Sequence, residues 1–372
     1  MLEIAAAELK AKLEAGEPLS VIDIREAADF AGWHIHGSNN VPVYDSLRLN
    51  DDEPLIQRSK TIPKDQSIVT VCKEGVISKK AADLLRSLGY DARSLAGGMR
   101  GWGGIWSEAP IPYEADPQAT FVQIRRNGKG CLSYLFGASG QAAVVDPSVD
   151  VRAYQELAER EKLKITHVLE THVHADHLSR ARELARAADA TLVLPPNGRA
   201  VYPFRAMVDG ESLEIGGLPV EAVATPGHTT ESTCYLVGNA LLLTGDTLFV
   251  DAVGRPDLEK GDEGAEVGAR MLFQSLRERL LGRFGDIPFY PAHHGKPMGF
   301  ERTPIGSSLE AVRSKMSIVR ADEEEFVRTI VDGLGEKPGN HATIIAVNEG
   351  KSALDELDAL DLEAGPNRCA AC

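Results

Sequence analysis

One ten-residue stretch, "ETHVHADHLS" from position 170 to position 179, concentrates side chains that bind metals. Three histidines and one aspartate fall within six consecutive positions, in a chain of 372 residues that has only ten histidines. Imidazole and carboxylate groups are the usual protein ligands of zinc and of non-haem iron. The stretch therefore predicts a metal centre, and its metal-capable residues are His172, His174, Asp176 and His177.

Strand-like apolar runs must position these side chains. The run "KLKITHVLET" ends just before the histidine-rich stretch, and "LPVEAVATPG", "NALLLTG" and "DIPFYPA" each end at a histidine or an aspartate. In layered α/β folds the strand ends form one rim, where sites are usually built. We therefore expect one site from seven residues, and its three further members are His228, Asp246 and His293.

A cysteine forms a second candidate site. In "TVCKEGVISKKAADLL", Cys72 ends a strand-like run, and Ser78 is placed to cap the helix that follows. A short loop between a strand and a helix start presents several backbone N–H groups, which stabilise an anion or a thiolate. The same position also suits a buried structural cysteine, so the residues alone leave both readings open.

The whole chain sets limits on size, partners and compartment. At 372 residues, with 43% hydrophobic and 26% charged residues, it is long enough for two folded domains. A net charge of −15 disfavours nucleic acid or an anionic membrane as a partner. The first residues lack the pattern of a secretion signal, and no stretch approaches the roughly 20 apolar residues of a membrane span. Five scattered cysteines fit reduced thiols, so we expect a cytoplasmic protein.

One seam divides the chain. The segment "WSEAPIPYEADPQATF" interrupts the alternation of strand and helix patterns with prolines and acids. We expect a first domain over 1–110, a linker over 111–119 and a second domain over 120–372. The first part alternates buried strands with an amphipathic helix that ends on Gly89, which predicts an α/β domain with a small parallel sheet.

The first part resembles the rhodanese family. The blocks "VIDIREAADFAGWHIHGSNNVP", "VCKEGVIS" and "LAGGMRGW" follow in that family's order and spacing, over nearly all of residues 1–110. The resemblance implies a rhodanese-like α/β sulfurtransferase domain, in which the thiol of Cys72 becomes a persulfide inside the loop. Glu74 departs from the pattern, because it adds a negative charge to the anion cradle and Lys73 offsets it only in part. A domain that only docks or relays sulfur is the alternative.

The second part resembles the metallo-β-lactamase superfamily. The match rests on "THVHADH", "TPGHT", "LLLTGDTLF" and "YPAHHG" and extends over residues 120 to about 300. It implies an αββα sandwich, so that the chain combines an α/β domain with an α+β domain. The superfamily includes hydrolases with two zinc ions, notably glyoxalase II, and persulfide dioxygenases with one iron. Both groups carry nearly the same ligands, so the seven motif residues leave both open.

Two further stretches resemble the persulfide dioxygenases. In "DTLFVDAVGRPDLEKGD", Arg255 matches that family's substrate-site arginine, and the tail "LEAGPNRCAAC" resembles its signature "P-x-N-x-R-C". The planar guanidinium of Arg255 suits a substrate carboxylate, and the alternative is a structural salt bridge with Asp257 or Glu259. One departure follows "YPAH", where His294 and Gly295 stand in place of the usual Asp-Tyr.

The resemblance implies a role for each motif residue. His172, His228 and Asp246 would bind one Fe(II) per chain and leave positions open for a persulfide sulfur and O₂. The remaining four would orient these ligands, or bind a second metal in a hydrolase: His174, Asp176, His177 and His293.

The expected function is bifunctional. The second domain would oxidise a thiol persulfide, expected to be glutathione persulfide, with O₂ to sulfite. The first would transfer sulfur through Cys72, with thiosulfate or sulfite as the other reactant. Two alternatives stay open: a dinuclear zinc thioester hydrolase of the glyoxalase II type, and a persulfide carrier or sensor. The sequence leaves open whether the chain forms a homo-oligomer.

The other cysteines carry less information. Cys131 and Cys234 sit within apolar strand-like runs, which favours core packing. Cys369 and Cys372 form a Cys-x-x-Cys at the end of the chain without the strand-to-helix context of a redox motif, so we expect a frayed tail.

Overall fold

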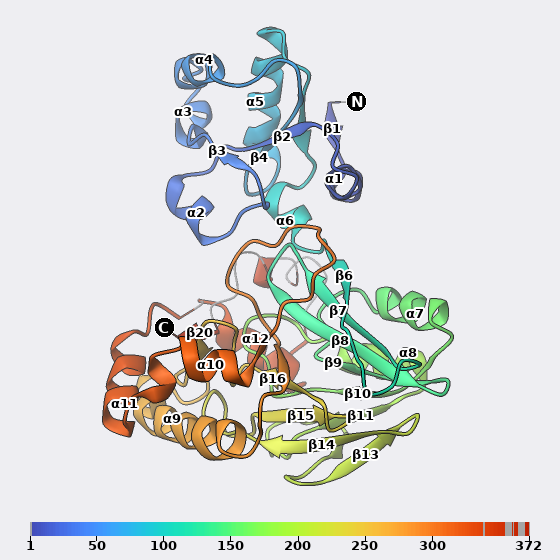
Figure 1. The fold of residues 1–372 in the computed structure, drawn as a ribbon. Helices are drawn as coiled ribbons and strands as arrows, with labels where there is room; N and C mark the ends of the chain where they lie inside the picture. The colour runs from blue at the N-terminus through green and yellow to red at the C-terminus, as the bar shows by residue number, and fades with distance from the viewer. Residues whose placement is uncertain (1, 338, 354–358, 360, 364–368, 372) are drawn as a thin grey trace.

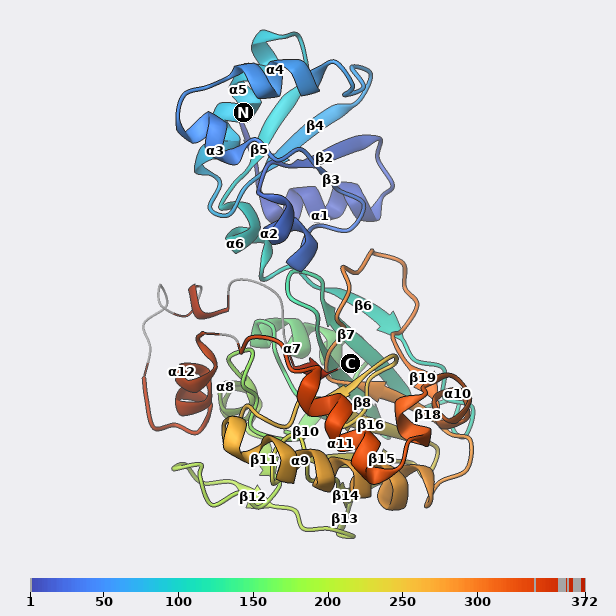
Figure 2. The ribbon, with the colours of Figure 1, turned by 90° about the vertical axis from the view of Figure 1, so that its left-hand side faces the viewer.

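The computed structural model describes residues 2–337, 339–353, 359, 361–363 and 369–371. Figure 1 shows a smaller α/β unit stacked on a larger unit that contains two sheets, and Figure 2 shows the same stacking from the side. In the described part of the chain, no helix is both long and apolar enough to cross a membrane.

The smaller unit is built on one five-stranded sheet in the order β1-β5-β4-β2-β3. All of its strand pairs are parallel, which confirms the α/β prediction for this part of the chain. Separate apolar clusters form around Ile68 and around Trp102. The elements are β1 (Glu3–Ile4), α1 (Ala6–Glu14), β2 (Leu19–Asp23), α2 (Ala27–Gly32), β3 (Asn39–Asn40), α3 (Tyr44–Arg48), α4 (Glu53–Ser59), β4 (Ser67–Val71), α5 (Val76–Ser87), β5 (Ala92–Leu95) and α6 (Gly98–Trp102).

The larger unit contains a seven-stranded sheet in the order β12-β11-β10-β9-β8-β7-β6 and a six-stranded sheet in the order β13-β14-β15-β16-β18-β19. Their strands are β6 (Ser107–Pro110), β7 (Thr120–Arg126), β8 (Cys131–Ala138), β9 (Gln141–Val145), β10 (Lys164–Leu169), β11 (Thr191–Leu194), β12 (Arg205–Ala206), β13 (Ser212–Ile215), β14 (Leu218–Ala224), β15 (Thr233–Val237), β16 (Leu241–Gly245), β18 (Pro288–Pro291) and β19 (Ser307–Ser308). A short ribbon pairs β17 (Val253–Gly254) with β20 (Ala370–Ala371).

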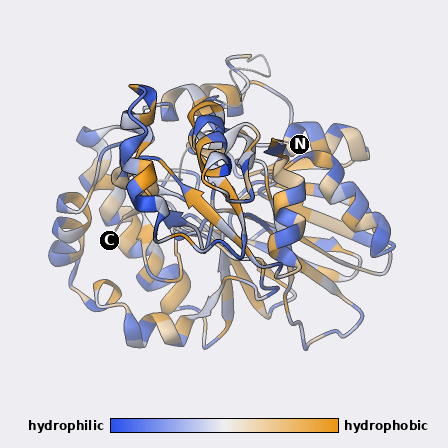
Figure 3. Ribbon diagram, turned by 90° about the horizontal axis from the view of Figure 1, so that it is seen from above, coloured by the Kyte–Doolittle hydropathy of each residue, from blue (hydrophilic) through white to orange (hydrophobic). Residues whose placement is uncertain are grey.

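Helices cover the outer faces of the two sheets. They are α7 (Val151–Arg160), α8 (Ala181–Ala188), α9 (Asp262–Gln274), the π-helix η1 (Ser275–Leu281), α10 (Leu309–Lys315), the 3-10 turn η2 (Ile318–Arg320), α11 (Glu323–Asp332) and α12 (His341–Asn348). One apolar cluster joins both sheets, including Phe136 and Tyr235, and two further clusters lie under the helices. This layering is the predicted αββα sandwich. In Figure 3 the helices carry both hydrophilic and hydrophobic colour, as expected for elements with one buried face.

Strand direction explains how the site is assembled. The four apolar runs singled out in the sequence are strands β10, β14, β16 and β18. β16 and β18 are parallel, and β14 has the same direction because β15 is antiparallel to both β14 and β16. The carboxyl ends of these three strands therefore meet at one edge of their sheet.

The two units meet a few residues before the predicted linker. β6 pairs with β7, so the seven-stranded sheet begins at Ser107, ahead of the predicted linker. Across the junction, the Arg126 guanidinium donates to the Gly103 carbonyl (2.8 Å) and the Gly128 N–H donates to the Ile105 carbonyl (3.1 Å). The domain limits at 110 and 120 remain a prediction.

Candidate metal centre

The seven predicted side chains come together in the interior of the sandwich domain. His172 to His177 lie in the loop after β10, and the others follow β14, β16 and β18. Every one of the seven is at most 3% exposed. A buried group of this polarity requires partners or a cation, since burial of unpaired polar atoms is costly.

Three of the seven face a common point. The Nε2 atoms of His172 and His228 each lie 3.6 Å from Oδ2 of Asp246, and the ligand atoms of all three lie within 4.8 Å of one another. The two imidazole rings stand nearly perpendicular, at 86°. None of these three buried atoms has a hydrogen-bond partner among the described residues. Unpaired donor atoms that converge in this way fit a metal held by two imidazoles and one carboxylate.

Hydrogen bonds behind the rings fix which nitrogen faces the metal position. Nδ1 of His228 lies 2.7 Å from the carbonyl oxygen of Arg255, which can only accept, so Nδ1 carries the proton and Nε2 offers a lone pair. The Thr171 hydroxyl donates to Asp146 (2.9 Å), so its oxygen accepts from Nδ1 of His172 (2.9 Å). Both histidines therefore present Nε2 as a ligand atom.

The charge states suit a metal site. Burial, and then the neighbouring His174, holds the pKa of His172 well below its ordinary value, so this imidazole is neutral. Burial acts to raise the pKa of Asp246, but the charge and hydrogen bond of His293 outweigh it and the pKa is lowered. A neutral imidazole and an ionised carboxylate are the forms that bind metals.

His174 belongs to a different group, although its ring lies only 4.2 Å from that of His172. Its Nε2 lies 3.0 Å from Glu170 and 3.2 Å from Asp146, and the three form a separate buried cluster. Burial lowers the pKa of His174, but the carboxylates of Asp146 and Glu170 raise it well above its ordinary value. Nε2 of His174 therefore faces carboxylates of its own and not the point shared by His172, His228 and Asp246.

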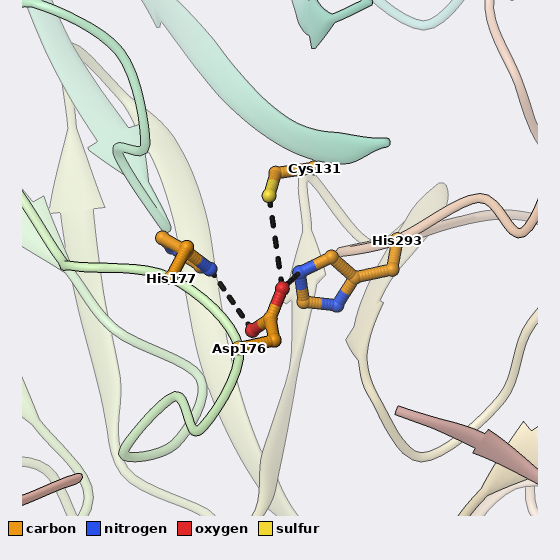
Figure 4. Close-up of side chains that lie close together, drawn as sticks. All are labelled: Cys131, Asp176, His177 and His293. Carbon is orange, nitrogen blue, oxygen red and sulfur yellow. Dashed lines mark hydrogen bonds and ion pairs between the residues drawn. The ribbon is translucent and has the colours of Figure 1, made fainter. Parts of the chain in front are cut away.

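The other motif residues form a third group, which includes a cysteine (Figure 4). Asp176 lies between His177, whose Nδ1 is 3.0 Å away, and His293, whose Nε2 is 2.8 Å away. The thiol of Cys131 lies 3.7 Å from the same aspartate. The Nδ1 atom of His293 contacts Asp246 at 2.6 Å, so this group adjoins the three converging ligands.

Sequence reasoning missed several members of these clusters. Cys131 is buried as predicted, but its thiol faces the aspartate–histidine group instead of packing only against apolar side chains. Asp146 directly follows β9, so the rule of strand ends that identified the other residues could have found it. Glu170 stands within the quoted histidine-rich stretch itself.

Arg255 lies beside the site with its side chain already paired. Its Nε and Nη2 atoms donate to the two carboxylate oxygens of Asp257 at 2.8 and 3.0 Å, and Nη2 also donates to the Gly335 carbonyl (2.8 Å). The side chain of Arg255 is only 3% exposed. This is the salt bridge that the sequence offered as the alternative, with Asp257 as the partner. A role in substrate binding remains a prediction.

The end of the chain reaches the metal centre, so the prediction of a frayed tail is wrong for Cys369. The N–H of Arg255 donates to the Cys369 carbonyl (2.9 Å), and β20 extends this pairing. Cys369 is fully buried, and its thiol groups with Asp246 and His293. The pairing depends on two-residue strands, which carry no recognisable pattern. Cys372 lies outside the described residues.

The Cys72 loop forms the second predicted site. The Cys72 thiol accepts hydrogen bonds from the N–H groups of Gly75 (3.2 Å) and Ser78 (3.4 Å) and contacts the Ser78 hydroxyl (3.2 Å). The predicted helix cap is wrong, because α5 begins two residues before Ser78 and Gly75 precedes it with φ 84°. Ser78 instead turns its hydroxyl inward to the thiol. Next to the loop, Lys73 lines a cavity of about 800 Å³ between the domains.

The comparisons with known proteins agree with this architecture. The family model of the metallo-beta-lactamase superfamily matches residues 126–327, and that of the rhodanese-like domain matches residues 5–104. The chain therefore belongs to the metallo-beta-lactamase superfamily and carries a rhodanese-like domain at its amino-terminal side, as the sequence motifs predicted.

Three particular proteins illustrate the similarity. The human persulfide dioxygenase ETHE1, mitochondrial, is 27% identical over 206 residues, which cover 53% of this chain and 74% of that protein. A hydroxyacylglutathione hydrolase from Rhizobium meliloti is 33% identical over 158 residues, 42% of this chain and 58% of the hydrolase. The crystal structure of ETHE1 from Myxococcus xanthus has a TM-score of 0.54 and 28% identity, and covers 62% of this chain and 99% of that protein.

Proposed function

We propose that this chain is a bifunctional enzyme of sulfur metabolism, in which the sandwich domain is an iron-dependent persulfide dioxygenase and the first domain is a sulfurtransferase. The observation that carries the proposal is the separation of His174 from the converging ligands. Nε2 of His172, Nε2 of His228 and Oδ2 of Asp246 are buried, unpaired and directed at one point, whereas Nε2 of His174 faces the carboxylates of Glu170 (3.0 Å) and Asp146 (3.2 Å). Two histidines and one carboxylate with open positions are typical of mononuclear iron(II) oxygenases.

In this proposal His172, His228 and Asp246 hold one iron(II) per chain. Iron bound there would supply electron exchange between a sulfur atom and O₂, which zinc cannot supply because it has no redox chemistry. The protein holds both imidazoles in the tautomer that presents Nε2. His293 positions Asp246 by its 2.6 Å contact, and Asp176 lies against the other nitrogen of His293 at 2.8 Å. Each of the three side chains is 1% exposed, so the protein shields the site from bulk solvent.

The proposed substrate is glutathione persulfide. One molecule of persulfide, O₂ and water would give one molecule each of free thiol and sulfite, because both atoms of O₂ and the oxygen of water go to the terminal sulfur while the S–S bond breaks. The similarity to proteins named persulfide dioxygenase supports this substrate class. Arg255 would bind a carboxylate of the glutathione part, and this contact requires it to share or leave Asp257.

The Cys72 loop would carry the sulfur between reactants. The Cys72 thiolate takes a sulfur atom from a donor such as thiosulfate, which leaves as sulfite, and an acceptor thiol then removes that sulfur as a persulfide. Backbone N–H groups of Gly75 and Ser78 stabilise the negative charge on the sulfur. The same chemistry run in reverse would consume the sulfite that the other domain makes. We place both steps in the cytoplasm.

A second candidate function is a dinuclear zinc thioester hydrolase. It is favoured by the similarity to hydroxyacylglutathione hydrolase and by the nearness of Asp176, His177 and His293 to Asp246. A third reading is a persulfide carrier or sensor, in which Cys72 holds sulfur stably and turnover is small.

Metal analysis of freshly purified protein separates these candidates. The dioxygenase predicts close to one iron per chain, lost on Asp246→Ala and largely retained on His177→Ala. The hydrolase predicts two zinc ions and no iron, with one ion lost on His177→Ala. A stable Cys72 persulfide with negligible turnover of persulfide or thioester would support the carrier.

A further inference from the structure

The cavity of about 800 Å³ between the two domains is lined by residues of both. We propose that this cavity binds a zwitterionic thiol of tripeptide size, which accepts sulfur from Cys72, and that the sandwich domain completes the binding site. The proposal rests on the proposed sulfurtransferase activity of the first domain. It adds to that activity the place where the acceptor binds and the participation of the second domain.

The carboxyl edge of the smaller sheet forms one wall of the cavity. Strands β2, β4 and β5 are parallel, so their carboxyl ends lie at the same edge. Arg25, Lys73 and Met99 follow these strands in turn, and all three line the cavity. The Met99 N–H donates to the carbonyl of Cys72 (2.8 Å), and Lys73 is the next residue in the chain. This wall therefore begins at the Cys72 loop, on the side of α2 and α6 that faces the larger unit in Figures 1 and 2.

The sandwich domain forms the opposite wall with residues that follow two parallel strands, β9 and β10. Ser148 follows β9, and Arg180 follows β10 and the histidine-rich loop. Both residues line the cavity, together with Arg126 at the end of β7. The cavity thus lies between the two strand edges that carry the two candidate sites, so a molecule bound in it contacts both domains.

Three buried polar atoms on these walls call for a ligand. Nε1 of Trp33, Oγ of Ser148 and Nε of Arg180 make no hydrogen bond to any described residue, and all three side chains line the cavity. The indole and guanidinium N–H groups can only donate, and the serine hydroxyl is able to donate. Buried donors require acceptors. The two walls therefore suit a ligand that carries carboxylate oxygens.

The charges on the walls indicate that the ligand also carries a cation. The guanidinium of Arg180 lies 3.5 Å from Glu363 and 3.9 Å from Glu183, which leaves room for a closer carboxylate. Lys73, which is exposed, forms no ion pair within the described part of the chain, and neither does the exposed Asp29 on α2. Basic groups would hold the carboxylates of the ligand, and Asp29 would hold an ammonium group. This combination is that of a small peptide.

The size of the cavity supports the same class of ligand. Pockets that enclose organic ligands have volumes of about 300 to 1,000 Å³. The volume of about 800 Å³ falls in this range and is far larger than a thiosulfate ion requires. A peptide thiol of this size can place its carboxylates against the sandwich wall while its sulfur reaches the Cys72 loop.

The transfer itself needs no further reactant. The acceptor thiol releases its proton to solvent, and its thiolate bonds to the outer sulfur of the Cys72 persulfide. The bond between that sulfur and Sγ of Cys72 breaks, and its electron pair stays on Sγ. Cys72 returns as a thiolate, which the N–H groups of Gly75 and Ser78 stabilise. The acceptor leaves as a persulfide, so the acceptor is oxidised and Cys72 is reduced.

Binding is tested without turnover in the full-length Cys72→Ser variant, by calorimetry with S-methylglutathione as the probe. Adding Arg180→Ala should weaken binding by about 10- to 100-fold, the effect of one lost charge-assisted hydrogen bond, and Trp33→Phe should also weaken it. Arg186→Ala is the matched control, because Arg186 is exposed on α8 and does not line the cavity. Probe bound at the metal centre would respond to neither Arg180→Ala nor Trp33→Phe.

Sulfur transfer from thiosulfate gives a second readout with Cys72 present. The ratio of kcat/KM for glutathione to kcat/KM for dithiothreitol, which carries no charged group, should fall in Arg180→Ala. The fall should appear mainly as a higher KM for glutathione, since Arg180 binds the acceptor and does not take part in the transfer. Arg186→Ala should keep the wild-type ratio. An unchanged ratio in Arg180→Ala would contradict the proposal.

Circular dichroism and melting temperature check that each variant is folded. Absence of probe binding, or equally tight binding in all variants, would overturn the proposal. Binding of thiosulfate alone, with the same dependence on Arg180, would also overturn it, because the cavity would then serve the sulfur donor. A wild type that transfers no sulfur, although the probe binds with the expected dependence, would contradict the proposed sulfurtransferase activity and support the binding site.

Discussion

The Cys72 loop and the metal centre use opposite ways of stabilising charge. The loop relies on backbone N–H groups from one continuous segment, and every donor to the Cys72 thiol lies within six residues of it. The metal centre relies on side chains from four strand ends in two different sheets. Apart from Cys72 itself, the loop should therefore depend mainly on its backbone geometry, whereas the metal centre should depend mainly on the identity of its side chains.

The largest expected effect is on the metal centre, from Asp246→Ala. The variant removes one of three ligands and the acceptor of the His293 hydrogen bond, so it should lose both iron and persulfide oxidation. Metal analysis and a sulfite assay measure the two losses. Asp251→Ala, an exposed aspartate paired with Lys296 on the same connection, is the matched control and should change neither. Full activity without Asp246 would remove it from the ligand set.

Cys72→Ser should abolish one activity and spare the other. Without the thiol, thiosulfate-to-thiol sulfur transfer and persulfide labelling should disappear, because serine is a far weaker nucleophile and cannot carry sulfur. Metal content and oxidation of supplied glutathione persulfide should stay nearly unchanged. Unchanged sulfur transfer in the variant would contradict the role of Cys72.

Arg255→Ala tests substrate binding against structure. If the guanidinium binds a glutathione carboxylate, kcat/KM should fall, and the fall should correspond to a loss of about 2 to 3 kcal/mol of transition-state stabilisation, the value of a charge-assisted pair. Arg255→Lys should recover only part of this loss, because lysine lacks the planar fork. Asp257→Asn is the matched variant, since it breaks the salt bridge but keeps the arginine. Lower melting temperatures in both variants, with wild-type kinetics in both, would assign Arg255 to structure alone.

Gly98→Ala tests the backbone side of the comparison. Gly98 has φ 55°, and a Cβ there would lie 2.2 Å from the Cys72 carbonyl oxygen and 2.6 Å from the Gly75 nitrogen. The substitution should therefore distort the loop and cost on the order of 1 to 3 kcal/mol of unfolding free energy. Chemical denaturation and the sulfur-transfer rate measure this effect. Gly104→Ala, where a Cβ meets nothing within 4 Å, should be nearly neutral. Equal behaviour of the two variants would contradict the strain argument.

The two regions also differ in how far the sequence predicts them. The strands that lead to Thr171, His228, Asp246 and His293 were predictable, because each is a largely apolar run that ends shortly before a polar residue. The family motifs identified the metal-capable side chains within those loops, which the structure brings together. Patterns of this kind depend only on residues that are close in the sequence, so they can be recognised without knowing the tertiary structure.

Contacts between distant segments were not predictable in the same way. The sequence around Cys131 predicts a core residue. The structure pairs its backbone with that of His293, and this pairing brings its thiol to the metal-capable side chains. Asp146 and Glu170 both lie near Nε2 of His174 because β9 and β10 are neighbouring strands. No local sequence pattern indicates this pairing. Cys369 reaches the site through the β17–β20 pairing. Even the local prediction for Ser78 failed, because Gly75 allows the left-handed turn that starts α5 earlier.

Persulfide-dependent O₂ uptake tests the central claim most directly. Iron-loaded and zinc-loaded forms of the full-length protein are supplied with glutathione persulfide, and O₂ consumption and sulfite release are recorded together, with a glutathione thioester as the alternative substrate. The account predicts one O₂ consumed and one sulfite released per persulfide by the iron form, and no oxidation by the zinc form. Thioester cleavage by a protein that holds two zinc ions, without any persulfide-dependent O₂ uptake, would contradict it.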